Sequence, residues 1–85
     1  MSKWEKAKKR IKDKPRDYTY SEARALLGHM GFKEYQKGRT SGSRVKFFRA
    51  KDEKVVLLHK PHPGDIMDRG AVADLADYLT SIGEL

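Results

Sequence analysis

Apolar residues recur along the chain at helical spacing in two segments. In the first segment they stand three and four residues apart, at Ala23, Leu26, Leu27 and Met30. This spacing places them on one face of a helix. Thr19-Tyr20-Ser21-Glu22 has the form of a capping box, and Gly31 stands where a C-terminal cap glycine is expected. We therefore predict an amphipathic helix over residues 19–30.

The same periodicity returns at the end of the chain. The apolar face there consists of Val72, Leu75, Ala76, Leu79 and Ile82. Asp68 can cap the start of this helix and Gly83 can end it.

Three short β-prone segments separate the two predicted helices. They are residues 32–37, residues 44–49, which alternate between polar and apolar, and residues 55–59. The last of these is the most strongly β-prone, so we expect it to be the central or best-buried strand. Connections as short as 38–43 and 51–54 predict an antiparallel meander.

Two amphipathic helices need an apolar surface to cover, and one face of the sheet is the large one available. We therefore predict an α+β two-layer sandwich of αβββα order over residues 18–85. It has a three-stranded antiparallel sheet with both helices on one face, and the other face stays open. Before it, Trp4, Ala7 and Ile11 stand among lysines, and Lys14-Pro15 breaks their pattern. Residues 1–17 are a short helix or a disordered basic arm, and the sequence leaves this choice open.

Charge is the compositional feature that bears on function. The 85 residues carry a net charge of +7 and no cysteine. Residues 1–17 and 33–60 are basic, whereas residues 61–85 are acidic. A basic block on a predicted sheet favours a polyanionic partner, although an ordinary solvated surface has the same composition.

Several classes of protein are disfavoured by the same sequence. The longest apolar run is Val55-Val56-Leu57-Leu58, far too short to span a membrane, and the N-terminus lacks the apolar core of a signal peptide. We expect a cytoplasmic protein that does not act at membranes. A chain this short cannot enclose a deep cavity, so we expect no small-molecule substrate. His59 and His62 have no convincing third ligand, and we expect neither a metal nor a cofactor.

Two groups of residues could carry chemistry. Around Gly42-Ser43-Arg44, backbone N–H groups and a guanidinium could hold a phosphate. Three further cations could bind the same phosphate or its neighbours, namely Lys37, Arg39 and Lys46. His59 and His62 flank Lys60-Pro61, and imidazoles are suited to proton transfer in RNA cleavage. Equally, His59 could simply end a strand and His62 could order a proline-flanked loop.

Aromatic residues could stack on bases. The candidates are Tyr18, Tyr20, Tyr35, Phe47 and Phe48. Most such residues belong to cores. Phe48 is different, because it points outward with Arg44 and Lys46 if Val45 and Phe47 point inward.

The stretch from Tyr20 to Tyr78 resembles the HicA toxins of type II toxin–antitoxin systems. The matching features are a first helix ending in Gly31-Phe32, Gly42-Ser43 before the second strand, and a third strand leading to His62-Pro63-Gly64. The resemblance implies a double-stranded-RNA-binding-domain-like fold and a metal-independent endoribonuclease that cleaves mRNA and inhibits translation. It also implies a HicB-type antitoxin partner that covers the active face.

One position departs from the family pattern. The family motif is Gly-Ser-His, whose histidine is catalytic, and Arg44 stands at that position here. A guanidinium stays protonated and is a poor general base. Either His59 or His62 has taken over proton transfer, or the protein binds RNA or DNA without cleaving it. A third hypothesis makes residues 1–17 an interfacial helix for a membrane or a protein partner.

Overall fold

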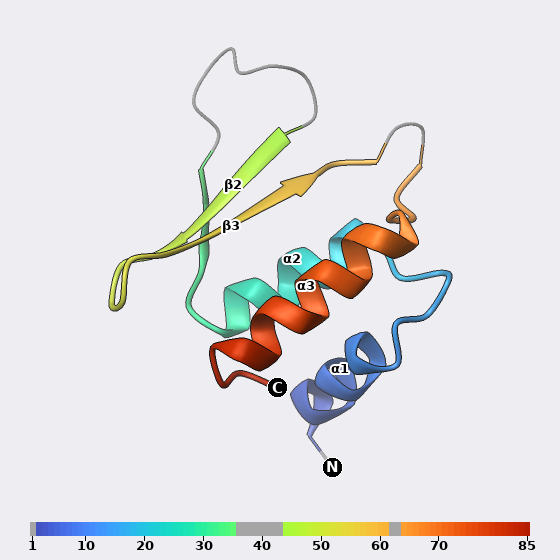
Figure 1. The fold of residues 1–85 in the computed structure, drawn as a ribbon, viewed down its shortest axis with the longest axis horizontal. Helices are drawn as coiled ribbons and strands as arrows, with labels where there is room; N and C mark the ends of the chain where they lie inside the picture. Colours follow the sequence, from blue (N-terminus) through green and yellow to red (C-terminus); the bar gives the residue numbers. More distant parts are fainter. Residues whose placement is uncertain (1, 36–43, 62–63) are drawn as a thin grey trace.

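The elements follow the predicted order. The computed structural model describes residues 2–35, 44–61 and 64–85. Its helices are α1 (Lys3–Lys12), α2 (Tyr20–His29) and α3 (Arg69–Ser81), and its strands are β1 (Lys33–Tyr35), β2 (Arg44–Arg49) and β3 (Lys54–His59). From α2 to α3 the order is αβββα, which confirms the predicted fold class (Figure 1).

The strands form an antiparallel sheet in the order β1-β2-β3. The expectation that residues 55–59 form the central or best-buried strand was wrong. Strand β3 lies at an edge of the sheet with two buried residues, whereas β2 lies in the middle with three. In a meander the spatial order follows the chain order, so the second strand is central whatever its composition. The high β-propensity of residues 55–59 shows that they fit a pleated sheet, but it does not indicate whether their strand is central or at an edge.

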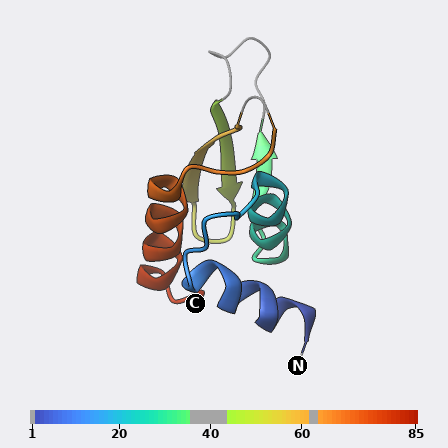
Figure 2. The ribbon, with the colours of Figure 1, turned by 90° about the vertical axis from the view of Figure 1, so that its right-hand side faces the viewer.

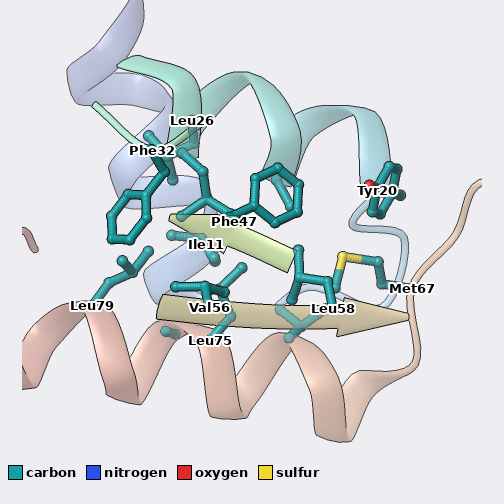
Figure 3. Close-up of a cluster of buried hydrophobic side chains, with 14 of the residues drawn as sticks. Ile11, Tyr20, Leu26, Phe32, Phe47, Val56, Leu58, Met67, Leu75 and Leu79 are labelled. Atoms are coloured by element: carbon teal, nitrogen blue, oxygen red, sulfur yellow. The ribbon is translucent and has the colours of Figure 1, made fainter. Parts of the chain in front are cut away.

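Helices α2 and α3 lie side by side on one face of the sheet (Figure 2). Alternate residues of β2 and β3 are buried against them, namely Val45, Phe47, Val56 and Leu58. The buried residues of the two helices are those that the helical spacing predicts, with Leu26 and Leu27 on α2 and Leu75 and Leu79 on α3. Figure 3 shows strand and helix side chains meeting in one cluster.

Capping residues in the local sequence determine where α2 and α3 end. Thr19 and Glu22 form the predicted capping box of α2. After α2, Gly31 has φ of 95°, and the N–H of Phe32 donates to the carbonyl of Leu27 at 2.9 Å. After α3, Gly83 has φ of 83°, and the N–H of Glu84 donates to the carbonyl of Leu79 at 2.9 Å. A left-handed glycine with this hydrogen bond satisfies carbonyls that the helix end leaves open.

Helix α1 lies on the side of the α2–α3 pair that faces away from the sheet (Figure 2). Ile11 is fully buried in the same core cluster as the sheet residues, and Trp4 and Ala7 pack against that cluster. The Trp4 ring stacks on His29 of α2, with centroids 4.2 Å apart and planes within 6°. Residues 3–12 are therefore a packed helix, and its apolar side is used inside the protein.

Candidate functional site

The face of the sheet opposite α2 and α3 has no helix over it in the described residues. Strand alternation sends every second side chain to this open face. The side chains there are Lys33, Tyr35, Arg44, Lys46, Phe48, Val55, Leu57 and His59, all exposed or half-buried. We call this set the open face. It combines cations with aromatic and aliphatic groups.

Arg44 and His59 are directly opposite each other on neighbouring strands. Residues paired in this way across antiparallel strands have Cβ atoms about 5 Å apart. Both side chains are exposed, so a guanidinium and an imidazole are available to the same ligand. The pairing of these two residues follows from the register of β2 and β3, since they are fifteen positions apart in the chain.

An aromatic pair lies further along the open face. The rings of Tyr35 and Phe48 meet edge to face with centroids 6.2 Å apart, and Lys46 Nζ lies 6.0 Å from the Phe48 centroid. Tyr35 is opposite Lys46, and Lys33 is opposite Phe48. Each ring therefore has a lysine beside it. Proteins that bind single-stranded nucleic acids use this combination, in which bases stack on the rings and cations neutralise the phosphates.

Two aliphatic residues of β3 also lie on this face, and the sequence reasoning had assigned them no role. Val55 is 41% exposed and Leu57 is 59% exposed. They belong to the continuous apolar run of residues 55–58, in which Val56 and Leu58 are buried, so composition alone gave no signal that separates the two faces of this strand. A cleft of about 320 Å³ runs between β3 and α3, lined by Leu57 and His59 on one side and Asp74 and Tyr78 on the other.

The structure brings together only part of the predicted site. Arg44, Lys46 and His59 share the open face, and Lys60 is exposed directly after β3. The remaining predicted residues, Lys37, Arg39, Ser43 and His62, lie outside the described residues. In the described part of the chain, no cation of the open face has a carboxylate within ion-pair distance.

Three of the proposed base-stacking aromatics are excluded from that role. Tyr18, Tyr20 and Phe47 are buried in the core. Burial, together with the hydrogen bond that Tyr20 donates to Glu34 at 3.0 Å, raises the pKa of Tyr20 to about 12. Burial likewise raises the pKa of Tyr18. Both phenols therefore remain protonated well above neutral pH, and both rings belong to the protein core.

The described residues contain neither a metal-binding cluster nor a membrane-spanning helix. No group of three or more His, Asp or Glu side chains in residues 2–35, 44–61 and 64–85 is arranged to hold a metal ion. None of the helices in the same ranges is long and apolar enough to cross a bilayer.

Comparison with known proteins gives the family. The family model described as the HicA toxin of bacterial toxin–antitoxin systems matches residues 20–80, which is more than two thirds of the chain. Searches of curated proteins and of solved structures gave no match. The matched range runs from the first residue of α2 almost to the end of α3, so it covers the sheet and both helices on it, whereas α1 lies before it. The chain therefore belongs to the HicA toxin family and is the toxin of a toxin–antitoxin system, which implies an antitoxin as its partner.

Proposed function

We propose that this toxin binds mRNA on the open face and cleaves it as a metal-independent endoribonuclease, which inhibits translation in the cytoplasm. The observation that carries the proposal is the pairing of Arg44 with His59 across β2 and β3. A phosphate-binding group and a proton-transfer group then act on one nucleotide, because both project from the same face.

Charge and aromatic groups on the open face support RNA as the ligand. Lys33, Arg44 and Lys46 can neutralise phosphates without first breaking an ion pair with a described carboxylate. Tyr35 and Phe48 present ring surface for bases. Unstacked bases are accessible in single-stranded RNA and not in a duplex, so this surface favours single-stranded regions of mRNA. We place Lys37, Arg39, Ser43 and Lys60 in the same RNA-binding set from their positions in the sequence.

The cleavage step needs a base, an acid and a cation. A base removes the proton of a ribose 2′-OH, and the 2′-oxygen attacks the adjacent phosphorus. The P–O5′ bond breaks, the 5′-oxygen takes a proton from the acid, and a 2′,3′-cyclic phosphate remains. We assign His59 and His62 to the two proton transfers and Arg44 to the charge on the phosphorane oxygens. Arg44 stands where the family motif has histidine, so proton transfer moves to the end of β3 in this variant.

A HicB-type antitoxin is the partner that we propose for the open face. Val55 and Leu57 expose aliphatic surface on the edge strand β3, opposite Phe48 and Lys46 of β2. Nucleic acid does not need such surface, whereas the core of a protein interface does. An antitoxin seated there would cover Arg44 and His59 and block RNA by exclusion.

Cleavage assays on purified variants test the assignment of His59 and His62. In EDTA, we expect wild-type protein to cut single-stranded RNA and leave cyclic phosphate ends. His59→Asn or His62→Asn should slow cleavage about 100-fold while leaving RNA affinity within a factor of about two, because general acid–base catalysis contributes that much. Arg44→Gln should weaken both binding and cleavage. Arg16→Gln, an exposed change in the α1–α2 connection, is the matched control and should behave as wild type.

The same assay separates catalysis from contamination. A nuclease carried through purification would cut equally in all preparations. Cleavage by the His59→Asn, His62→Asn double variant at the wild-type rate would therefore show that our assignment is wrong. RNA binding by wild type without cleavage favours the alternative function, a nucleic-acid-binding module that has lost nuclease activity through the change to Arg44.

A further inference from the structure

Helix α1 carries a second concentration of positive charge, on the other side of the α2–α3 pair from the sheet (Figure 2). Six of its ten residues are Lys or Arg and one is Glu. Arg10 pairs with Asp17 and Glu22, but the lysines of α1 have no carboxylate partner among the described residues. Lys3, Lys6, Lys9 and Lys12 are exposed. The family match begins after this helix, at the first residue of α2.

The packing of α1 limits what these lysines can bind. An interfacial membrane helix needs a free apolar face. In α1 that face is occupied, because Ile11 is fully buried and Trp4 and Ala7 pack against the core. A predominantly cationic surface remains, and such a surface binds polyanions by neutralising phosphates.

A groove runs from the β1 edge of the open face to the C-terminal end of α2, on which Trp4 of α1 stacks. It has a volume of about 420 Å³, and its lining includes His29, Lys33, Tyr35, Phe48 and Lys51. Tyr35 and Phe48 are the aromatic pair of the open face, and His29 carries the stacked Trp4 ring of α1. Lys3 Nζ lies 5.0 Å from the Trp4 ring. Among the described residues, those that line this groove include no carboxylate.

The other side of the open face, along β3, is electrostatically unfavourable for a polyanion. The cleft along β3 leads to α3, which presents Asp74 and Asp77. Asp77 accepts a hydrogen bond from Lys14 at 3.1 Å, which cancels one of the basic charges near α1. A phosphate backbone would meet negative charge on that side and positive charge on the side of β1.

We propose that a single strand of RNA bound on the open face continues round the β1 edge, through the groove at His29 and Lys33, and onto the lysines of α1. The Trp4–His29 stack lies where the strand turns, and its ring surface can receive a base. This inference rests on the proposed function, since it extends the same RNA beyond the sheet. It makes α1 an affinity element of the toxin and gives the protein a preference for long single strands.

RNA length separates the two parts of the surface. Strands of six residues, such as β2 and β3, are about 20 Å long. At the spacing of a helically stacked strand, about 3.4 Å per nucleotide, a six-mer spans about the same 20 Å and a 20-mer about 70 Å. The molecule measures 40 × 32 × 20 Å, so only the longer RNA can reach α1 from the sheet. Uniformly 2′-O-methylated RNA serves as the probe, because it lacks the attacking hydroxyl and cannot be cleaved.

The experiment compares Lys6→Gln, Lys9→Gln with the charge-matched control Arg16→Gln, Lys54→Gln by fluorescence anisotropy over a salt series. Glutamine keeps helix propensity and side-chain length while removing charge. We expect the α1 variant to bind the 20-mer about tenfold more weakly than the control at low salt and the six-mer equally well. Its salt slope for the 20-mer should fall by about 1.4, from two lost phosphate contacts at about 0.7 each.

The outcomes distinguish this inference from the proposed function. If wild type binds the six-mer and the α1 variant and its control bind the 20-mer equally, the path to α1 is wrong and the open face stands. Loss of six-mer affinity in the α1 variant would also contradict the inference, because α1 would then act on the sheet site itself. Wild-type protein that binds neither RNA contradicts the proposed function.

Discussion

Arg49 is a charged residue in the interior, only 3% exposed. It alternates with Val45 and Phe47 on β2 and so must point inward. Its guanidinium donates to both carboxylate oxygens of Asp52, to the carbonyl of Met30 at 3.0 Å and to Glu84 at 2.6 Å. These acceptors belong to the β2–β3 turn, the end of α2 and the segment after α3. One side chain therefore joins three parts of the chain. It also makes a cation–π contact with Phe32, with Cζ 4.8 Å from the ring centroid.

Replacing Arg49 should be among the more damaging single changes. We expect Arg49→Met to lower the free energy of unfolding by about 2–4 kcal/mol, because it leaves Asp52, Glu84 and the Met30 carbonyl without their donor. Glu84→Gln is the comparison, and it should cost about 1 kcal/mol, because Arg49 keeps its other acceptors. Urea denaturation followed by circular dichroism measures both. An Arg49→Met protein as stable as wild type would mean that solvent satisfies these acceptors.

At the level of elements, the attachment of α1 to α2 depends on Glu22. This residue completes the capping box of α2 and also forms an ion pair with Arg10 of α1. Hydrogen bonding from Arg10, followed by that from Thr19, holds the pKa of Glu22 below its usual range. The carboxylate therefore has two structural functions, and both depend on its charge or its oxygens.

This geometry predicts how stability responds to pH. A carboxyl group whose pKa is lowered by folding adds stability above its unfolded pKa, and that stability is lost as pH falls through the folded value. In the Glu22→Gln variant, the glutamine can still accept the capping hydrogen bonds, but it cannot form the ion pair with Arg10. The variant should therefore be less stable than wild type near pH 7 by about 0.5–1 kcal/mol. The difference should shrink between pH 7 and pH 3, as the pH falls toward the lowered pKa at which folded Glu22 takes up a proton. Urea midpoints at the two pH values check this, and a constant difference would exclude the ion pair as its cause.

At the level of the whole molecule, one hydrophobic cluster includes residues from α1, α2, the sheet and α3. The radius of gyration of 12.5 Å is that of a small compact unit. Charge is distributed unevenly around this unit, with cations on the open face and on α1 and carboxylates on α3. The shared core makes α1 a structural part of the toxin, although the family match begins only at α2.

A shared core implies cooperative unfolding. Ile11→Ala should lower the free energy of unfolding by about 2–4 kcal/mol and shift a single transition, because removing a buried side chain leaves a cavity in the common cluster. Lys12→Ala, an exposed change next to it on the same helix, should have little effect. Tryptophan fluorescence from Trp4 and far-ultraviolet circular dichroism should report the same midpoint. Separate transitions for the two probes would instead make α1 an independent arm.

The elements were predictable because their signals are local. The capping box at Thr19 and Glu22, the helical spacing of Val72, Leu75 and Leu79, and the alternation of residues 44–49 each report a backbone conformation within a few residues. The edge position of β3 and the burial of Arg49 were missed. The predicted meander already places β3 at an edge, and the alternation of residues 44–49 already turns Arg49 inward with Val45 and Phe47. Only the acceptors of Arg49 depend on distant segments, namely the end of α2 and the residues after α3.

The candidate site divides in the same way. The sequence by itself determined that Arg44, Lys46 and Phe48 would share one face, since a strand turns alternate residues to the same side. Only the tertiary structure decided that His59 is the residue opposite Arg44, that Tyr35 meets Phe48, and that Trp4 stacks on His29. The physical reason is that pairing register and helix packing arise from burial summed over the whole core, so they become defined only when distant segments fold together.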